Sequence, residues 1–112
     1  MAHFPQPHPQ RRASRVRIAD VTPLTITADG SKGLKGTLVS LSITGGCAQL
    51  PGRLNEGALV EVAIQSRFGA VTGLAEMLRP HQKGASLMQP FRFVALADDD
   101  HRCLRRLLSS AS

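Results

Sequence analysis

Aromatic side chains are scarce in this sequence. Among its 112 residues there is no tryptophan, no tyrosine and only four phenylalanines. Barrels that bind single-stranded nucleic acid use exposed aromatic rings as platforms on which bases stack. Phe91 and Phe93 fall on the expected buried face of a strand, which leaves few rings for that purpose. The composition therefore argues against a small basic barrel that binds nucleic acid.

Cysteine and long apolar runs are also scarce. Cys47 and Cys103 lie far apart without a CxxC pair, so we expect reduced thiols and no disulfide. No apolar stretch approaches the roughly 20 residues that cross a bilayer. The first thirty residues lack the apolar segment of a signal peptide. We therefore expect a cytoplasmic protein that does not insert into a membrane.

Catalytic motifs are absent as well. The sequence contains no GxSxG, HExxH or P-loop motif, and no GxGxxG after a strand. His3 and His8 lack carboxylate or thiol partners for a metal ion, and His101 beside an aspartate lacks a nucleophile. We expect no enzymatic activity, no metal and no cofactor.

The charge of the chain is strongly basic. Fourteen lysines and arginines oppose eight acidic residues, which gives a formal net charge of +6. Eleven of the basic residues are arginine. A planar guanidinium binds phosphate or carboxylate through two parallel hydrogen bonds, so an excess of arginine favours an anionic ligand.

The central part of the chain has the period of β-strands. Residues 1–9 carry three prolines and no periodicity, which predicts a flexible tail before a single domain over residues 10–112. From residue 16 onward apolar and polar residues alternate, with turn residues between the runs. Six short strands of this kind indicate an all-β antiparallel barrel or sandwich. The expected strands are 16–27 with a kink at Pro23, 34–42, 47–50, 58–65, 70–78 and 85–96.

The C-terminal end changes to the period of a helix. Apolar residues recur on one face and arginines on the opposite face. The apolar set is Leu104, Leu107, Leu108 and Ala111, and the basic set is Arg102, Arg105 and Arg106. The aspartates at 98–100 are expected to supply the N-cap and negative charge at the positive end of the helix dipole. We expect an amphipathic helix that plugs or flanks one end of the barrel.

Arginines cluster where the first strand begins. Arg11, Arg12 and Arg15 lie at the junction of the flexible tail and the strand. Guanidinium groups on a mobile hinge can fold over a ligand and bind separate phosphate oxygens or the O6 and N7 edge of guanine. A solvated entry to a strand would show the same cluster, so the run alone leaves both interpretations open.

A second candidate feature follows the strand over residues 34–42. Ser40 and Ser42 are two residues apart and place their hydroxyl groups on one face. Gly45 and Gly46 allow positive φ and a close approach of the backbone to a ligand. A turn between strands that needs glycine for its own geometry is the alternative interpretation.

Together, in this order, the two features resemble the PilZ domain, a small bacterial receptor for cyclic di-GMP. The family pattern is an RxxxR segment before the first strand and a (D/N)xSxxG motif on the strands that follow. Residues 11–15 (RRASR) match the first, and residues 40–45 (SLSITG) match the second except at its first position. Gly36, the late strand FRFVAL and the closing helix HRCLRRLL extend the resemblance over residues 10–109.

The resemblance implies a six-stranded antiparallel β-barrel with a C-terminal helix. It also implies a non-enzymatic receptor that transmits cyclic di-GMP binding to a protein partner by rearranging its N-terminal arginine segment. Arg11 and Arg15, assisted by Arg12, would hold the phosphates and the guanine edge. Ser42 would supply a hydroxyl contact, and Gly45 or Gly46 the close backbone approach.

Ser40 departs from the family pattern, which has Asp or Asn at that position. A carboxylate accepts two charge-assisted hydrogen bonds from a guanine edge, whereas a serine hydroxyl accepts one neutral bond. Charged hydrogen bonds contribute about 1.5–3 kcal/mol and neutral ones about 0.5–1.5 kcal/mol, so the change could weaken binding roughly tenfold. The alternative function is therefore a PilZ-like interaction adaptor that has lost or weakened cyclic di-GMP binding.

Overall fold

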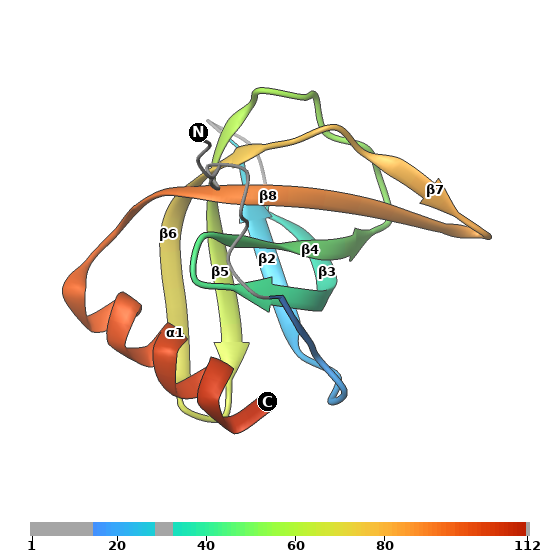
Figure 1. The fold of residues 1–112 in the computed structure, drawn as a ribbon. Coiled ribbons are helices and arrows are strands. Elements are labelled where there is room, and N and C mark those ends of the chain that lie inside the picture. Colours follow the sequence, from blue (N-terminus) through green and yellow to red (C-terminus); the bar gives the residue numbers. More distant parts are fainter. Residues whose placement is uncertain (1–14, 29–32, 112) are drawn as a thin grey trace, which may run out of the picture.

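The computed structural model describes residues 15–28 and 33–111. In this part of the chain eight strands precede one helix, and all of the strand pairings are antiparallel (Figure 1). The elements are β1 (Val16–Arg17), β2 (Pro23–Thr27), β3 (Leu34–Ser42), β4 (Gly45–Leu50), β5 (Leu59–Ser66), β6 (Gly69–Met77), β7 (His81–Lys83), β8 (Ser86–Leu96) and α1 (Asp98–Ala111).

Six of these strands close into a barrel. β2 pairs with β5, β5 with β6, β6 with β8, β8 with β4, and β4 with β3, which returns to β2. A closed ring leaves no unpaired strand edge within the barrel. The expected six-stranded antiparallel barrel is confirmed, with β1 and β7 added outside the ring on β3 and β8.

The expected strand over residues 16–27 is two strands in the structure. β1 lies against the end of β3, with Val16 opposite Leu41, whereas β2 lies against its beginning, with Leu24 opposite Gly36. Residues 18–22 connect the two outside any strand, and only the ends of this connection bond to β3: the Ile18 amide donates to the Val39 carbonyl, and the Thr22 carbonyl accepts from the Leu38 amide, both at 2.9 Å. Pro23, which lacks a backbone donor, is the first residue of β2, a position where a strand tolerates proline.

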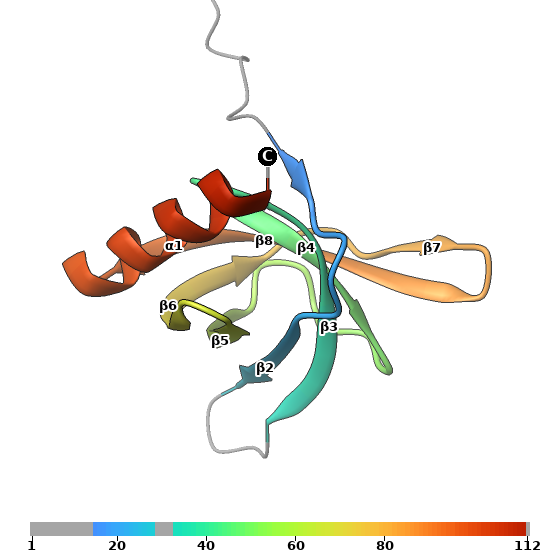
Figure 2. The same ribbon diagram turned by 90° about the horizontal axis from the view of Figure 1, so that it is seen from below.

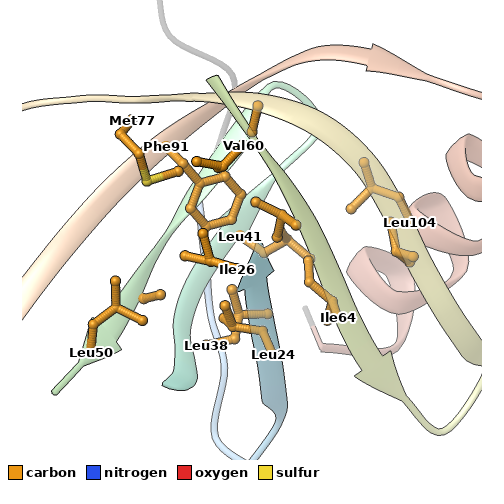
Figure 3. Close-up of a cluster of buried hydrophobic side chains, with 14 of the residues drawn as sticks. Leu24, Ile26, Leu38, Leu41, Leu50, Val60, Ile64, Met77, Phe91 and Leu104 are labelled. Atoms are coloured by element: carbon orange, nitrogen blue, oxygen red, sulfur yellow. The ribbon is translucent and has the colours of Figure 1, made fainter. Parts of the chain in front are cut away.

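The alternating apolar residues of the strands fill the barrel interior. Figure 3 shows side chains from β2, β3, β4, β5, β6 and β8 pointing toward one another, with Leu104 reaching in from α1. On β5, Val60, Val62 and Ile64 are buried while Glu61 is exposed, as the alternation predicts. The largest buried side chain is Phe91, whose ring meets that of Phe93 edge to face.

The C-terminal helix packs its apolar face on the barrel. Leu104 and Leu107 are buried, and α1 contacts β6 and β1. The expected N-cap needs correction, because the carbonyl of Ala97 accepts the first helical bond from the His101 amide at 2.9 Å. Ala97 is thus the capping residue, and the aspartates at 98–100 occupy the first turn. Among the described residues no helix is long and apolar enough to span a membrane.

The β7–β8 hairpin was not expected from the sequence. Its first strand consists of three exposed polar residues, His81–Lys83, which show no alternation. Figures 1 and 2 show this hairpin extending from the barrel on the side opposite α1. At its base, buried Gln89 donates to the Leu78 carbonyl at 2.8 Å and accepts from the Leu54 amide at 3.2 Å. The first bond holds the β6–β7 connection against β8, and the second holds the β4–β5 loop there.

Candidate ligand-binding site

A cavity of about 500 Å³ lies where the β3–β4 turn, the β6–β7 connection and β8 meet. The turn and β8 are joined there, because the Phe93 amide donates to the Thr44 carbonyl at 2.8 Å. The residues that line the cavity are Arg15, Ser42, Thr44, Gly45, Leu78, Arg79, His81, Pro90, Phe91 and Arg92. Three of the residues proposed from the sequence as ligand contacts therefore share one cavity, namely Arg15, Ser42 and Gly45.

Arg15, the residue immediately before β1, lines this cavity. β1 is paired with the end of β3, so the start of the described chain is held beside the β3–β4 turn. The Arg15 charge also acts on Cys47 of β4: burial raises the pKa of the Cys47 thiol, and Arg15 offsets part of that rise. Arg11 and Arg12 lie outside the described residues, as do His3 and His8.

The Ser42 hydroxyl is buried and is used within the turn. Its Oγ donates to the Gly45 carbonyl at 3.2 Å, accepts from the Thr44 amide at 3.3 Å, and lies 3.2 Å from the Thr44 hydroxyl. A hydroxyl has one proton and two lone pairs, and these contacts account for all three. Ser42 therefore shapes the cavity wall, and the exposed Thr44 beside it presents a hydroxyl to the cavity.

The positive φ expected at Gly45 and Gly46 needs correction. Neither has a positive φ; the described glycines that do are Gly57, Gly69 and Gly84. Gly45 and Gly46 are extended residues of β4, squeezed between β3 and β8. A Cβ on Gly45 would lie 2.9 Å from the Cα of Arg92, and one on Gly46 would lie 2.6 Å from the Ser40 carbonyl oxygen. The close approach that requires glycine here is to neighbouring strands.

Ser40 and Gly46 do not line the cavity. Ser40 is half-buried on β3, opposite Arg17 on one side and Cys47 on the other. The family motif thus divides in this chain: its serine, Ser42, and its glycine, Gly45, border the cavity, whereas its first position, Ser40, lies on β3 beside β1.

Four polar cavity residues were not identified from the sequence. Thr44, Arg79, His81 and Arg92 come from three separate segments. In the alternation along β8, the Arg92 side chain faces away from the core. Arg92 lies opposite Gly45 because β4 pairs with β8. Its guanidinium forms an ion pair with Glu76 of β6. With Arg15, Arg79 and Arg92 the cavity carries three guanidinium groups, whose positive charge suits an anionic ligand.

Comparison with known proteins agrees with this geometry. The family model described as the PilZ domain matches residues 9–110. No curated protein sequence matches the chain.

Solved structures with the same fold include YcgR from Escherichia coli in complex with c-di-GMP. That match has 21% identity and a TM-score of 0.78, and it covers 90% of this chain and 45% of YcgR. The isolated PilZ domain of YcgR with c-di-GMP matches with 21% identity and a TM-score of 0.72, covering 91% of each chain. The inhibitor of motility MotI from Bacillus subtilis matches with 16% identity and a TM-score of 0.69, covering 91% of this chain and 54% of MotI.

The chain thus spans about half the length of the YcgR and MotI chains that it matches. At these low sequence identities, the matches show only that the fold is shared. The family model, by contrast, covers almost the whole sequence, including both arginine and serine–glycine motifs. The closed barrel and the helix packed on it agree with that match. The chain belongs to the PilZ domain family.

Proposed function

We propose that this protein is a non-enzymatic, cytoplasmic receptor for cyclic di-GMP. The observation that carries the proposal is the meeting of Arg15 with the Ser42–Gly45 turn at one cavity. The E. coli PilZ protein of the same fold is described in complex with c-di-GMP, which supports the choice of ligand.

The chemistry of the cavity suits a cyclic dinucleotide. Such a ligand carries two phosphate groups, each with a negative charge, and two guanines with acceptors at O6 and N7. Arg15, Arg79 and Arg92 offer planar donors that bind either kind of acceptor bidentately. Thr44 adds a neutral hydroxyl, and Glu76 orients the Arg92 guanidinium by pairing with it. In the proposal, Arg11 and Arg12 extend this cationic lining from the segment before Arg15.

The proposed response to the ligand follows from the connection of Arg15 to β1. β1 has two residues and a single pairing partner, β3, so few backbone bonds hold it. A ligand that draws the arginine segment onto the cavity would fix or shift β1 relative to β3. We propose that a protein partner senses this change.

Isothermal titration calorimetry with cyclic di-GMP tests the proposal. The wild-type chain should bind, and Arg15→Ala should weaken binding about 10- to 100-fold, the loss expected for hydrogen bonds between charged groups. Changing Arg11 and Arg15 together to alanine should remove most of the heat. Arg53→Ala is the matched control, because exposed Arg53 lies in the β4–β5 loop and does not line the cavity. A folded wild-type protein that shows no binding at high micromolar ligand would refute the proposal.

A PilZ-like adaptor without nucleotide binding is the second candidate. Two observations favour it: Ser40 stands where the motif has Asp or Asn, and the Ser42 hydroxyl already has partners within the turn. Ser40→Asp separates the two candidates. A gain in affinity of about tenfold supports the receptor, because a carboxylate restores charge-assisted bonds to guanine. No gain, together with no effect of Arg15→Ala, supports the adaptor.

A further inference from the structure

A second basic surface lies away from the cavity, around the tip of the β5–β6 hairpin. Phe68 is at this tip, and the second half of α1 lies beside it. A hollow of about 410 Å³ is lined there by Phe68, Arg105, Arg106, Ser109 and Ser110. It shares no lining residue with the cavity that contains Arg15. We call these five residues, together with Arg67, the hairpin–helix surface.

The hairpin tip is held in one shape by local hydrogen bonds. Ser66 Oγ donates to the Gly69 carbonyl at 2.7 Å and accepts from the Phe68 amide at 3.1 Å. The thiol of Cys103 on α1 donates to the Phe68 carbonyl at 3.4 Å. Gly69 has a φ of 116°, a conformation that side chains other than glycine rarely adopt. The Phe68 ring, which is half-buried against the core, is therefore held at a fixed position beside the helix.

The guanidinium groups at this surface are close together. Arg67 and Arg106 lie over the Phe68 ring, at 5.9 and 5.4 Å from its centroid. Arg67 has a carboxylate partner, Asp20, at 2.7 Å. Arg105 and Arg106 form no ion pair with any of the described residues. Like charges gathered in this way repel one another, and an added anion would relieve that repulsion.

A second cavity, lined by both polar and apolar residues, continues the surface on the other side of the hairpin tip. Its volume is about 440 Å³, and its walls include the β1–β2 connection, Arg67 and Ser110. Val21 of that connection is 83% exposed, which is unusual for a large aliphatic side chain in a small barrel. An occupant of the hairpin–helix surface could therefore combine acidic groups on the arginines with an apolar side chain beside Val21.

The surroundings of the Phe68 ring argue against nucleic acid as the occupant of this surface. Bases bind such surfaces by stacking on an open ring. Phe68 already carries two guanidinium groups over its ring, and Phe91 and Phe93 pack in or against the core. The arginines of the hairpin–helix surface can still form hydrogen bonds to carboxylates, and apolar side chains lie beside them.

We propose that the hairpin–helix surface is a docking site for an acidic segment of a partner protein. The segment places carboxylates on Arg105 and Arg106 and an aliphatic side chain against Phe68 or Val21. This inference does not depend on cyclic di-GMP binding, because the surface and the Arg15 cavity share no residue.

A peptide titration followed by NMR tests the proposal. The probe is a short fluorescein-labelled peptide of alternating glutamate and leucine, added to the ¹⁵N-labelled full chain at physiological salt. Amide shifts should concentrate on residues 66–69 and 105–110. Fluorescence anisotropy should show that replacing Arg105 and Arg106 with glutamate weakens peptide binding about tenfold or more, as expected when charged hydrogen bonds are lost.

A matched double variant controls for net charge. Lys35 and Arg53 are exposed and lie on β3 and the β4–β5 loop. Replacing both with glutamate changes the net charge by the same amount, yet should alter peptide affinity by no more than about twofold, because salt screens distant charges. Because Arg105 and Arg106 are exposed, their variant should fold, which the NMR spectrum verifies directly.

Three results would overturn the proposal. Peptide shifts could centre on Arg15, Arg79 and Arg92, which would mean that acidic peptides occupy the ligand cavity. The two double variants could weaken binding equally, which would mean that net charge alone attracts the peptide. A single-stranded oligonucleotide could bind the hairpin–helix surface more tightly than the peptide, which would identify nucleic acid as the occupant.

Discussion

Gly45 and Gly46 show how tightly β4 is held between its neighbours. Both are buried and extended, and both face backbone atoms of an adjacent strand at distances that leave no room for a Cβ. The same residues bring the β3–β4 turn against β8, where the cavity lies. The glycine of the family motif thus allows close packing of the barrel strands and also borders the cavity.

Replacing Gly45 with alanine should destabilise the barrel. The new methyl group meets the Phe91 carbonyl and the Arg92 backbone, and overpacking of this kind costs about 1–3 kcal/mol. Gly52→Ala is the control, because its Cβ would meet nothing within 4 Å. The control should stay within about 0.5 kcal/mol of wild type. Urea denaturation measures both, and equal stabilities of the two variants would contradict this account of Gly45.

Cys47 should make stability depend on pH at alkaline values. Burial raises its pKa in the folded protein above the ordinary value of 9.0. Above pH 9 the unfolded chain therefore loses the thiol proton while the folded chain keeps it, so the free energy of unfolding falls as pH rises. Cys47→Ala should flatten that decline. Denaturation curves from pH 8 to pH 10 measure it, and identical slopes for both proteins would show that Cys47 does not contribute.

At the scale of elements, α1 is part of the core and also carries the basic outer surface. Leu104 is fully buried and Leu107 nearly so, whereas Arg105 and Arg106 between them are exposed. Asp100 ties the first turn to the barrel, because its carboxylate accepts from the Thr72 amide of β6 at 2.9 Å. The helix is thus anchored both by packing and by a hydrogen bond to a strand.

Leu104→Ala should cost about 2–5 kcal/mol of unfolding free energy, the usual range for leucine replaced in a core. Leu74→Ala is the matched control on β6, because that leucine is 41% exposed and leaves little cavity when shortened. Its cost should stay below about 1 kcal/mol. If the two substitutions proved equally mild in thermal unfolding, α1 would not be an integral part of the fold.

At the scale of the whole molecule, the proposed ligand site joins segments that are distant in sequence. Arg15, the β3–β4 turn, the β6–β7 connection and β8 surround one cavity, and barrel closure holds the last three in place. A ligand that bridges them binds the folded chain and not the unfolded one. Binding should therefore stabilise the barrel as a unit.

Cyclic di-GMP at about 100 times its Kd should raise the free energy of unfolding by about 2.7 kcal/mol. The same concentration should give Arg15→Ala a much smaller increase, because its Kd is higher. Differential scanning fluorimetry with and without ligand measures the shift, with Arg53→Ala as the unaffected control. An equal shift for Arg15→Ala and wild type would mean that Arg15 does not bind the ligand.

The sequence by itself determined the six barrel strands, the helix and the family, but not β7 or the division of residues 16–27 into β1 and β2. Apolar and polar residues alternate along β5 and β8, and apolar residues recur with a helical period after residue 97. These patterns can be seen in the sequence because one side of each element faces the core. Two short motifs then pointed to the family. Arg15, Ser42 and Gly45 could be proposed as site residues for the same reason.

Only the tertiary structure decided which residues share the cavity. Arg79, His81 and Arg92 belong to no motif, and strand register places them beside Arg15. The structure also showed that Gly45 and Gly46 are packed tightly between neighbouring strands and do not have positive φ. Local periodicity records which face of a strand is buried but carries no information about which strand lies next to it, and the site is formed between strands.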